Sequence, residues 1–259
     1  MALLAQPSLF DSNVLLGPLP VPPPGAPEQR ADLLATLDRY GIAQGLVTHT
    51  LAKWHDPASG NRRLAKEIAG EQRLVACWVV LPSATGETAA EEEQVAQLLA
   101  AGARAARLCP TAHRLSLEPW EVDRLLGALA ERRVPLLLDM DNRHWSEARP
   151  WTFIERACRT FPTLPMVLLR EPQANLRTLF PLLDRCANLV VETSYLQGHE
   201  TIRLIVERWG ADRLVFGTGL PAWDPSMAIT GLTYAGLEPD ALAAIGGGTL
   251  GHLLEGCLL

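Results

Sequence analysis

Short apolar runs alternate with longer amphipathic segments along the whole chain. The apolar runs have the length and composition of buried β-strands and mostly end at Gly, Pro or a polar residue. The segments between them show helical periodicity. In residues 119–132, for example, apolar positions recur at i, i+3, i+4 and i+7, one face of a helix: Val122, Leu125, Leu126 and Leu129. Regular alternation of strand and helix is typical of a parallel α/β protein.

The pattern predicts eight strands, each followed by a helical return. We expect strands at residues 9–17, 42–48, 74–81, 103–108, 134–139, 165–170, 189–193 and 214–217. We expect helices at residues 28–40, 61–69, 91–101, 119–132, 150–161, 173–184 and 201–209, with closing helices within 239–258. The proline-rich segment 18–27 should be an irregular, stiff loop. A chain of 259 residues with this order matches one (β/α)8 TIM barrel, so we predict a single domain over residues 1–259.

The strand ends carry a recognisable resemblance. Four segments carry it. Two are the stretches Asp212-Arg-Leu-Val-Phe-Gly-Thr-Gly-Leu-Pro221 and Leu9-Phe-Asp-Ser-Asn-Val-Leu-Leu-Gly17, and the other two are the ends of the strands expected at residues 134–139 and 165–170. Together they resemble the amidohydrolase-related (amidohydrolase 2) family of metal-dependent hydrolases and decarboxylases. The resemblance covers most of the chain and implies the same TIM-barrel fold, with the active site at the C-terminal ends of the strands.

The resemblance also implies where the family binds its metal. An Asp precedes a His-x-His pair on the first strand, strands five and six each supply a His, and the last strand supplies an Asp. Asp11 is present, but the five metal positions hold Asn13, Leu15, Asp139, Arg170 and Gly219. A catalytic zinc ion needs about three protein ligands, and only Asp139 is a good one. We therefore expect no metal and no cofactor at this site.

The substitutions suggest a different use of the barrel mouth. Asp139 and Arg170 should face the barrel axis at the ends of neighbouring strands, where the carboxylate could be the counter-ion of the guanidinium. Either this pair plugs a disused site, or Arg170 recognises a carboxylate or phosphate through its planar fork. The ligand-binding candidates are Asn13, His49, Arg107, Arg170, Trp145 and Trp223. The catalytic candidates are Asp139, Arg170, Glu192 and His144.

Two other groups of residues could form a catalytic pair or a metal site, but their spacing gives little support for either. Cys109 and His113 could form a thiolate–imidazole pair, although Pro110 makes a helical arrangement doubtful and such spacing usually means nothing. His49, His113, His144 and Asp139 could form a new metal site from separate loops, but their spacing follows no known ligand pattern.

Charge and cysteine content restrict the partners. The net charge of −6 and the isoelectric point near 5.6 argue against nucleic acid and anionic membranes. Five cysteines without C-x-x-C spacing indicate free thiols, and we expect a cytoplasmic protein. A small anionic or ring-containing ligand is the expected partner, and a protein partner or a homodimer is also open.

Three functions follow. The first is a non-catalytic, ligand-binding or assembly subunit, which the loss of every metal ligand favours. The second is a metal-independent hydrolase, lactonase or decarboxylase acting on a small carboxylate. There Asp139, Glu192 or His144 would be the base, and Arg107 or Arg170 would stabilise an oxyanion. The third is a metallohydrolase with relocated ligands.

Overall fold

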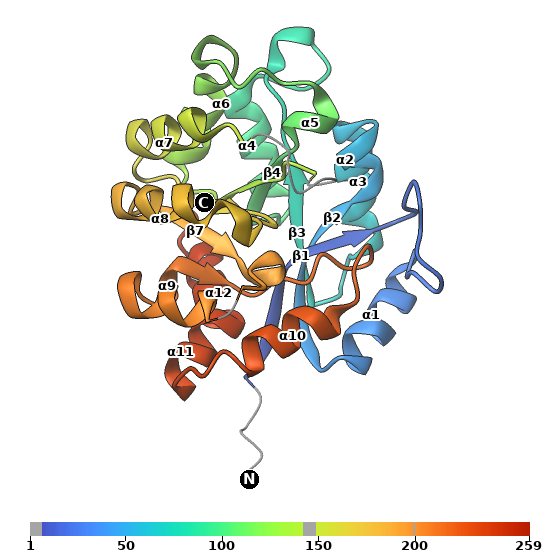
Figure 1. The fold of residues 1–259 in the computed structure, drawn as a ribbon. Coiled ribbons are helices and arrows are strands. Elements are labelled where there is room, and N and C mark those ends of the chain that lie inside the picture. The colour runs from blue at the N-terminus through green and yellow to red at the C-terminus, as the bar shows by residue number, and fades with distance from the viewer. Residues whose placement is uncertain (1–6, 142–148, 199) are drawn as a thin grey trace.

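Eight parallel strands form a barrel at the centre of the protein (Figure 1). The computed structural model describes residues 7–141, 149–198 and 200–259. Its strands are β1 (Leu9–Leu16), β2 (Ile42–His49), β3 (Leu74–Val79), β4 (Ala105–Leu108), β5 (Leu136–Leu138), β6 (Met166–Leu168), β7 (Leu189–Glu192) and β8 (Leu214–Val215). Each strand pairs with the next in the chain, in the order β1 to β8. The predicted TIM barrel is therefore confirmed.

The barrel closes where β1 meets the segment that contains β8, a contact that we call the seam. The backbone N–H of Ser12 donates to the carbonyl of Phe216 (2.9 Å), and that of Leu15 donates to the carbonyl of Leu220 (2.8 Å). The buried carboxylate of Asp11 adds a side-chain link, because it accepts hydrogen bonds from the backbone N–H and the hydroxyl of Thr218. Backbone and side-chain bonds thus hold the two ends of the sheet together.

Helices surround the strands (Figure 1). They are α1 (Arg30–Arg39), α2 (Thr50–Trp54), α3 (Pro57–Glu67), α4 (Glu91–Ala100), α5 (Pro110–His113), α6 (Pro119–Glu131), α7 (Trp151–Thr160), α8 (Leu176–Arg185), α9 (Thr201–Trp209), α10 (Pro225–Thr233), α11 (Pro239–Ala243) and α12 (Thr249–Glu255). A π-helical turn, Ala244–Gly248, joins the last two. The expected face of α6 is buried, at Val122, Leu125, Leu126 and Leu129.

The sequence did not predict α2, α5 or α10, and each has a local cause. In α2, Nδ1 of His49 accepts the N–H of Leu51 (3.0 Å) and so caps the first turn. In α5, Pro110 occupies the first helical position, where its missing N–H costs nothing. In α10, the side chain of Asp224 accepts the N–H of Ser226 (2.8 Å), and Pro225 follows the cap. A proline that we took as a helix breaker near Cys109 therefore begins a helix instead.

The core has two layers because neighbouring strand residues point to opposite faces of the sheet. Leu137 and Val167 face the barrel interior, where they pack with Leu46 and Val215. Their neighbours on β5 and β6 instead belong to the larger cluster between sheet and helices: Leu136, Leu138, Met166 and Leu168. Burial on both faces explains why these strands read as continuous apolar runs.

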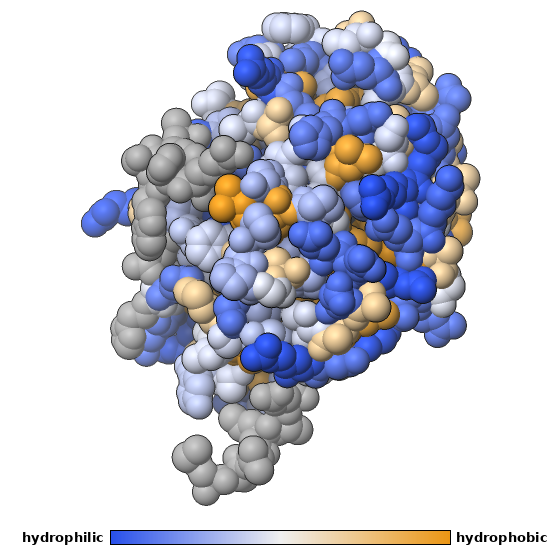
Figure 2. All heavy atoms as spheres, turned by 90° about the vertical axis from the view of Figure 1, so that its right-hand side faces the viewer, coloured by the Kyte–Doolittle hydropathy of each residue, from blue (hydrophilic) through white to orange (hydrophobic). Residues whose placement is uncertain are grey.

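The surface carries no single large apolar area in the view of Figure 2, where hydrophilic atoms predominate and hydrophobic ones form small separate patches. Isolated exposed apolar side chains of this kind are normal for a globular protein. Within the described residues, no helix combines the length and the apolar character needed to cross a membrane.

Candidate functional site

A cavity of about 460 Å³ opens at the C-terminal ends of the strands, and we call it the mouth cavity. Its lining includes all five positions at which the sequence departs from the metal-binding pattern: Asn13, Leu15, Asp139, Arg170 and Gly219. Arg107 and Trp223, two further residues expected to bind ligand, also line it. The parallel barrel brings them together because the ends of all its strands meet at one rim.

Asp139 lies between two cations. Its Oδ2 atom is 2.7 Å from the ammonium of Lys53 and 2.7 Å from Nη2 of Arg107. All three side chains are buried. Burial opposes ionisation of Asp139, but Lys53 and Arg107 outweigh it and hold the pKa of this carboxyl well below its usual value. Asp139 is therefore a firmly ionised counter-ion, and its salt-bridge partners differ from Arg170, the partner expected from the sequence.

Arg107 connects this cluster to the opposite side of the barrel. Its Nη2 atom donates to Oδ1 of Asn13 (2.7 Å), and Nδ2 of Asn13 lies 3.5 Å from Oε2 of Glu192. Glu192 also accepts hydrogen bonds from the backbone N–H of Arg170 and the hydroxyl of Ser194. Complete burial nevertheless raises the pKa of Glu192. One polar network thus runs from Lys53 across the mouth to Glu192.

Arg170 lies against two aromatic rings. Its guanidinium carbon is 4.3 Å from the ring centroid of Trp223 and 4.9 Å from that of Tyr195. Burial lowers the pKa of Arg170, which Glu192 and Asp139 partly counteract. Cation–π contacts of this kind hold a guanidinium in place while leaving its donors directed along the plane of the group.

Two residues of the mouth have strained backbone. Asp141 has φ of 66° and Arg170 has φ of 54°, in the left-handed region that L-residues seldom adopt. They follow β5 and β6, and both line the mouth cavity. Such conformations cost about 1–3 kcal/mol each and concentrate at functional sites. Arg114, Leu117, Arg133 and Glu200 share this conformation outside the mouth, so the strain accompanies the cavity and does not by itself define a site.

The donors at the mouth do not fit a divalent metal ion. Asp139 is already engaged by two cations, Oδ1 of Asn13 accepts from Arg107, and Leu15 and Gly219 have no donor atom. The described parts of the chain contain no group of three or more His, Cys, Asp or Glu side chains arranged to hold a metal. A cation placed here would also meet the charges of Lys53 and Arg107.

Other predicted residues lie elsewhere. His49 lines a neighbouring cavity, where its Nε2 atom is 3.5 Å from Glu67, so it is not part of the mouth. Cys109 directly precedes α5 and His113 ends it, but burial raises the pKa of the Cys109 thiol to about 12, which leaves it un-ionised at neutral pH. His144 and Trp145 lie outside the described residues.

Lys53 is a residue of the mouth cluster that the sequence analysis did not identify. It lies on α2, directly after β2, and its long side chain reaches 2.7 Å from Asp139 and 2.9 Å from Asp141. Burial opposes its charge, yet Asp139 raises the pKa of Lys53, which therefore stays protonated. The available signal was a single lysine in the connection after a strand, where barrel active sites are built.

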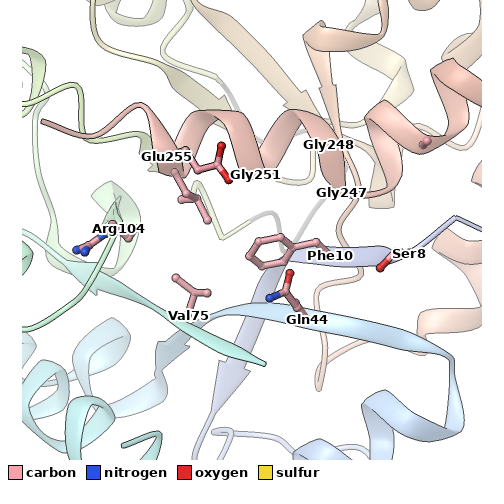
Figure 3. Close-up of a pocket in the computed structure, with 11 residues that line it drawn as sticks. Ser8, Phe10, Gln44, Val75, Arg104, Gly247, Gly248, Gly251 and Glu255 are labelled. Carbon is pink, nitrogen blue, oxygen red and sulfur yellow. The ribbon is translucent and has the colours of Figure 1, made fainter. Parts of the chain in front are cut away.

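A separate cavity of about 480 Å³ lies at the opposite, N-terminal end of the barrel (Figure 3). Phe10 of β1 points into it beneath the C-terminal helix, and Gly247, Gly248 and Gly251 line that side. Arg104 and Glu255 are its charged residues among those described. This end of a TIM barrel usually serves stability, so we place the candidate site at the mouth.

Comparisons with known proteins agree with this architecture. The family model described as amidohydrolase matches residues 17–249. Among solved structures, an uncharacterised TIM-barrel protein from Bordetella bronchiseptica superposes with a TM-score of 0.73 at 15% identity, covering 96% of this chain and 98% of that one. No curated protein sequence matches the chain significantly.

Two further solved structures are similar. The 5-carboxyvanillate decarboxylase of Sphingomonas paucimobilis has a TM-score of 0.70 at 17% identity and covers 96% of this chain and 99% of its own. A putative 2-pyrone-4,6-dicarboxylic acid hydrolase from Pseudomonas putida has a TM-score of 0.70 at 17% identity, covering 98% and 100%. At these identities the structural likeness establishes the fold alone. The family match, which spans most of the chain, shows that this protein belongs to the amidohydrolase family.

Proposed function

We propose that the mouth cavity binds a small carboxylate ligand without a metal ion, and that the protein is a ligand-binding member of its family rather than a metallohydrolase. The observation that carries this proposal is the cluster in which Lys53 and Arg107 flank Asp139, with Arg170 on the same cavity. Among the described residues of the lining, these three cations face two carboxylates, Asp139 and Asp141. The excess positive charge favours an anion.

Hydrogen-bonding capacity supports a carboxylate in particular. Nη1 of Arg107 is buried and has no hydrogen-bond partner among the residues that the structure describes. A buried donor left unpaired costs about 1–3 kcal/mol, which a ligand oxygen would recover. Nε and Nη2 of Arg107 are already bonded to Asp139 and Asn13, so the bidentate contact to a carboxylate that suits a guanidinium group would come from Arg170 on the same cavity.

The aromatic side of the cavity supports a flat ligand. Trp223 is 42% exposed at the mouth and Trp54 also lines the cavity. Indole rings stack on planar groups. The similar solved structures include proteins named for 5-carboxyvanillate, 2,6-dihydroxybenzoate and 2-pyrone-4,6-dicarboxylic acid, all of them ring carboxylates. By this analogy a benzoate-like ring is the ligand to test first.

The protonation states favour binding over turnover. Asp139 is held ionised by two cations and is therefore a weak base, while Lys53 stays protonated and is therefore a poor nucleophile. Glu192 has a raised pKa, as a general acid or base needs, but Asn13, Ser194 and the backbone of Arg170 occupy its oxygens.

A metal-independent hydrolase, lactonase or decarboxylase is the second candidate, and one observation favours it. Glu192 is linked through Asn13 to Arg107, so a proton-exchanging carboxyl lies one side chain away from an oxyanion-binding cation. Glu192→Gln would remove such activity while leaving ligand affinity intact. Asp38→Asn, on the exposed side of α1, is the control variant. An equal loss of activity in this variant would show that the effect of Glu192→Gln is not specific to a catalytic role of Glu192.

Calorimetric titration with benzoate and 2,6-dihydroxybenzoate tests the binding proposal. We expect saturable binding, weakened roughly 10- to 100-fold by Arg170→Gln, because a hydrogen bond to a charged group contributes about 1.5–3 kcal/mol. Arg63→Gln is the matched control, since Arg63 is exposed on α3 and pairs with Glu67 outside the mouth cavity. Absence of binding by both compounds, or binding that requires added Zn²⁺ or Mn²⁺, would contradict the proposal.

A further inference from the structure

A second cavity adjoins the mouth. It has a volume of about 490 Å³, and we call it the side cavity. Leu19, Pro20 and Trp54 line both cavities and therefore form the border between them. Ligand-binding pockets usually measure about 300–1,000 Å³, and the two cavities together approach the upper end of that range. The combined space exceeds what a benzoate-sized ligand fills.

The chemistry of the two cavities differs. The mouth cavity is lined by Lys53, Arg107 and Arg170 with their acidic partners. Apolar groups dominate the wall of the side cavity: Pro18, Leu19, Pro20, Leu51 and Trp54.

The polar groups of the side cavity are partly occupied, since Nε2 of His49 and Nε1 of Trp54 have no hydrogen-bond partner among the described residues. His49 has its Nδ1 occupied by the N–H of Leu51, and burial lowers the pKa of His49 although Glu67 opposes the shift, so the ring is neutral at pH 7. Arg63, the charged residue on this wall among those described, pairs with Glu67 at 2.7 Å. Because apolar side chains form most of its wall, the side cavity suits an apolar group.

The border is tied to the charged cluster. Nζ of Lys53 lies 5.0 Å from the ring centroid of Trp54 and 2.7 Å from Asp139. The ammonium that pairs with Asp139 therefore also makes a cation–π contact with the indole at the border between the cavities. The proline-rich loop supplies the other part of the border, and its prolines limit backbone movement. Both parts of the border, the indole of Trp54 and the proline-rich loop, thus have restricted movement.

We propose that the side cavity binds an apolar tail of the same molecule whose carboxylate occupies the mouth. The ligand class is then a ring carboxylate bearing an alkyl or aryl substituent, rather than an unsubstituted benzoate or a dicarboxylate. This inference rests on the proposed carboxylate-binding function, and it adds a second subsite formed by Pro18, Leu51 and Trp54.

Titration with benzoate and with 4-pentylbenzoate separates the two proposals. Each buried methylene contributes about 0.8 kcal/mol, or roughly fourfold in affinity, so we expect 4-pentylbenzoate to bind at least roughly 30-fold more tightly than benzoate. Leu51→Trp and Pro18→Phe, which fill the side cavity, should each remove this gain and leave the benzoate affinity unchanged. Leu204→Trp is the control, because it adds the same side chain on the exposed face of α9.

The outcomes are distinct. Equal affinities for the two compounds in the unmodified protein, or a pentyl gain that survives both Leu51→Trp and Pro18→Phe, would overturn the side-cavity proposal while benzoate binding upholds the mouth. Pro18 is exposed, so its substitution gives a folded variant for this comparison even where Leu51→Trp does not. Failure of both compounds to bind would overturn the carboxylate-binding function and the side-cavity proposal together.

Discussion

The ammonium of Lys53 lies 2.7 Å from Oδ2 of Asp139, although the two residues are 86 positions apart in the chain. Lys53 follows β2 and Asp139 follows β5, so their contact bridges the mouth of the barrel. Arg107 contacts the same oxygen from β4. The two buried cations therefore share one carboxylate, and Lys53 also pairs with Asp141 at 2.9 Å.

Asp139→Asn should destabilise the fold strongly. The substitution leaves Lys53 and Arg107 buried without their shared counter-ion, which we expect to cost about 3–5 kcal/mol in the free energy of unfolding. Asp38→Asn is the control, because Asp38 is 66% exposed and pairs with Arg73 at the surface, where such pairs contribute about 0–1 kcal/mol. Urea unfolding measures both. Similar losses in the two variants would show that the cluster is not a buried ion pair in solution.

Asp11 should give the protein a distinctive pH dependence. Burial raises the pKa of Asp11 to about 6, against which its hydrogen bonds with Thr218 act. The folded protein therefore holds this proton more tightly than the unfolded chain. Its stabilising contribution is complete below the unfolded pKa of about 3.9 and is lost as pH rises through the folded pKa.

Relative to Asp11→Asn, the free energy of unfolding should thus fall by up to about 3 kcal/mol between pH 4 and pH 7, since each pKa unit corresponds to about 1.4 kcal/mol. Glu192, whose pKa is also raised by burial, should act in the same direction. Urea unfolding at a series of pH values measures the difference. Parallel profiles for the two proteins would contradict a raised pKa at Asp11.

Gly219→Asp should disturb the mouth and not restore a metal site. Gly219 has φ of +74°, and a Cβ there would lie 3.1 Å from Cδ1 of Trp223 and 3.5 Å from Nη1 of Arg170. Gly25→Asp is a matched control, because Gly25 also has φ of +74° but has nothing within 4 Å of a Cβ. The left-handed backbone costs both variants about 1–2 kcal/mol.

The control isolates the contact with Trp223. We expect only Gly219→Asp to lose benzoate affinity, measured by calorimetry, with no gain of zinc binding. Stoichiometric zinc bound by Gly219→Asp would instead mean that the neighbouring groups can rearrange around a metal.

Metal content gives a direct check on the donor argument. Protein purified without a metal-affinity tag should contain far less than stoichiometric zinc, manganese or iron by mass spectrometry, because Lys53 and Arg107 occupy the carboxylate of Asp139. A full equivalent of metal that disappears in His113→Ala and Asp139→Asn would support relocated ligands instead.

The periodicity of apolar residues and the strand-end motifs were sufficient to predict the fold. The alternation of apolar runs and helical faces predicted all eight strands to within a few residues, because parallel strands buried on both faces must be apolar throughout. The helices α2, α5 and α10 were missed. The five residues of α2 and the four of α5 carry little periodicity, and in all three helices a side-chain cap or a proline at the first helical position decides where the helix begins.

The sequence predicted that several candidate residues lie at one rim, but not which of them pair. Strand ends placed Asn13, Arg107, Asp139 and Arg170 at one rim, and all line the same cavity. Which cation contacts Asp139 depends on side-chain length and on the stagger of the strands, and neither can be read from spacing. Lys53 therefore replaced the expected partner, and Arg170 packs against Trp223 and Tyr195.

The seam described above bears on how this barrel would respond to a ligand. Asn13 and Leu15 line the mouth from one side of the seam, whereas Gly219 and Trp223 line it from the other. β8 is only two residues long, so few strand residues are available for backbone pairing at this point of the barrel. A bound molecule would contact residues on both sides of the seam and so link the first strand to the last. Occupancy of the mouth would then slow the separation of β1 from β8, and the barrel would be cleaved more slowly by proteases when a ligand is bound.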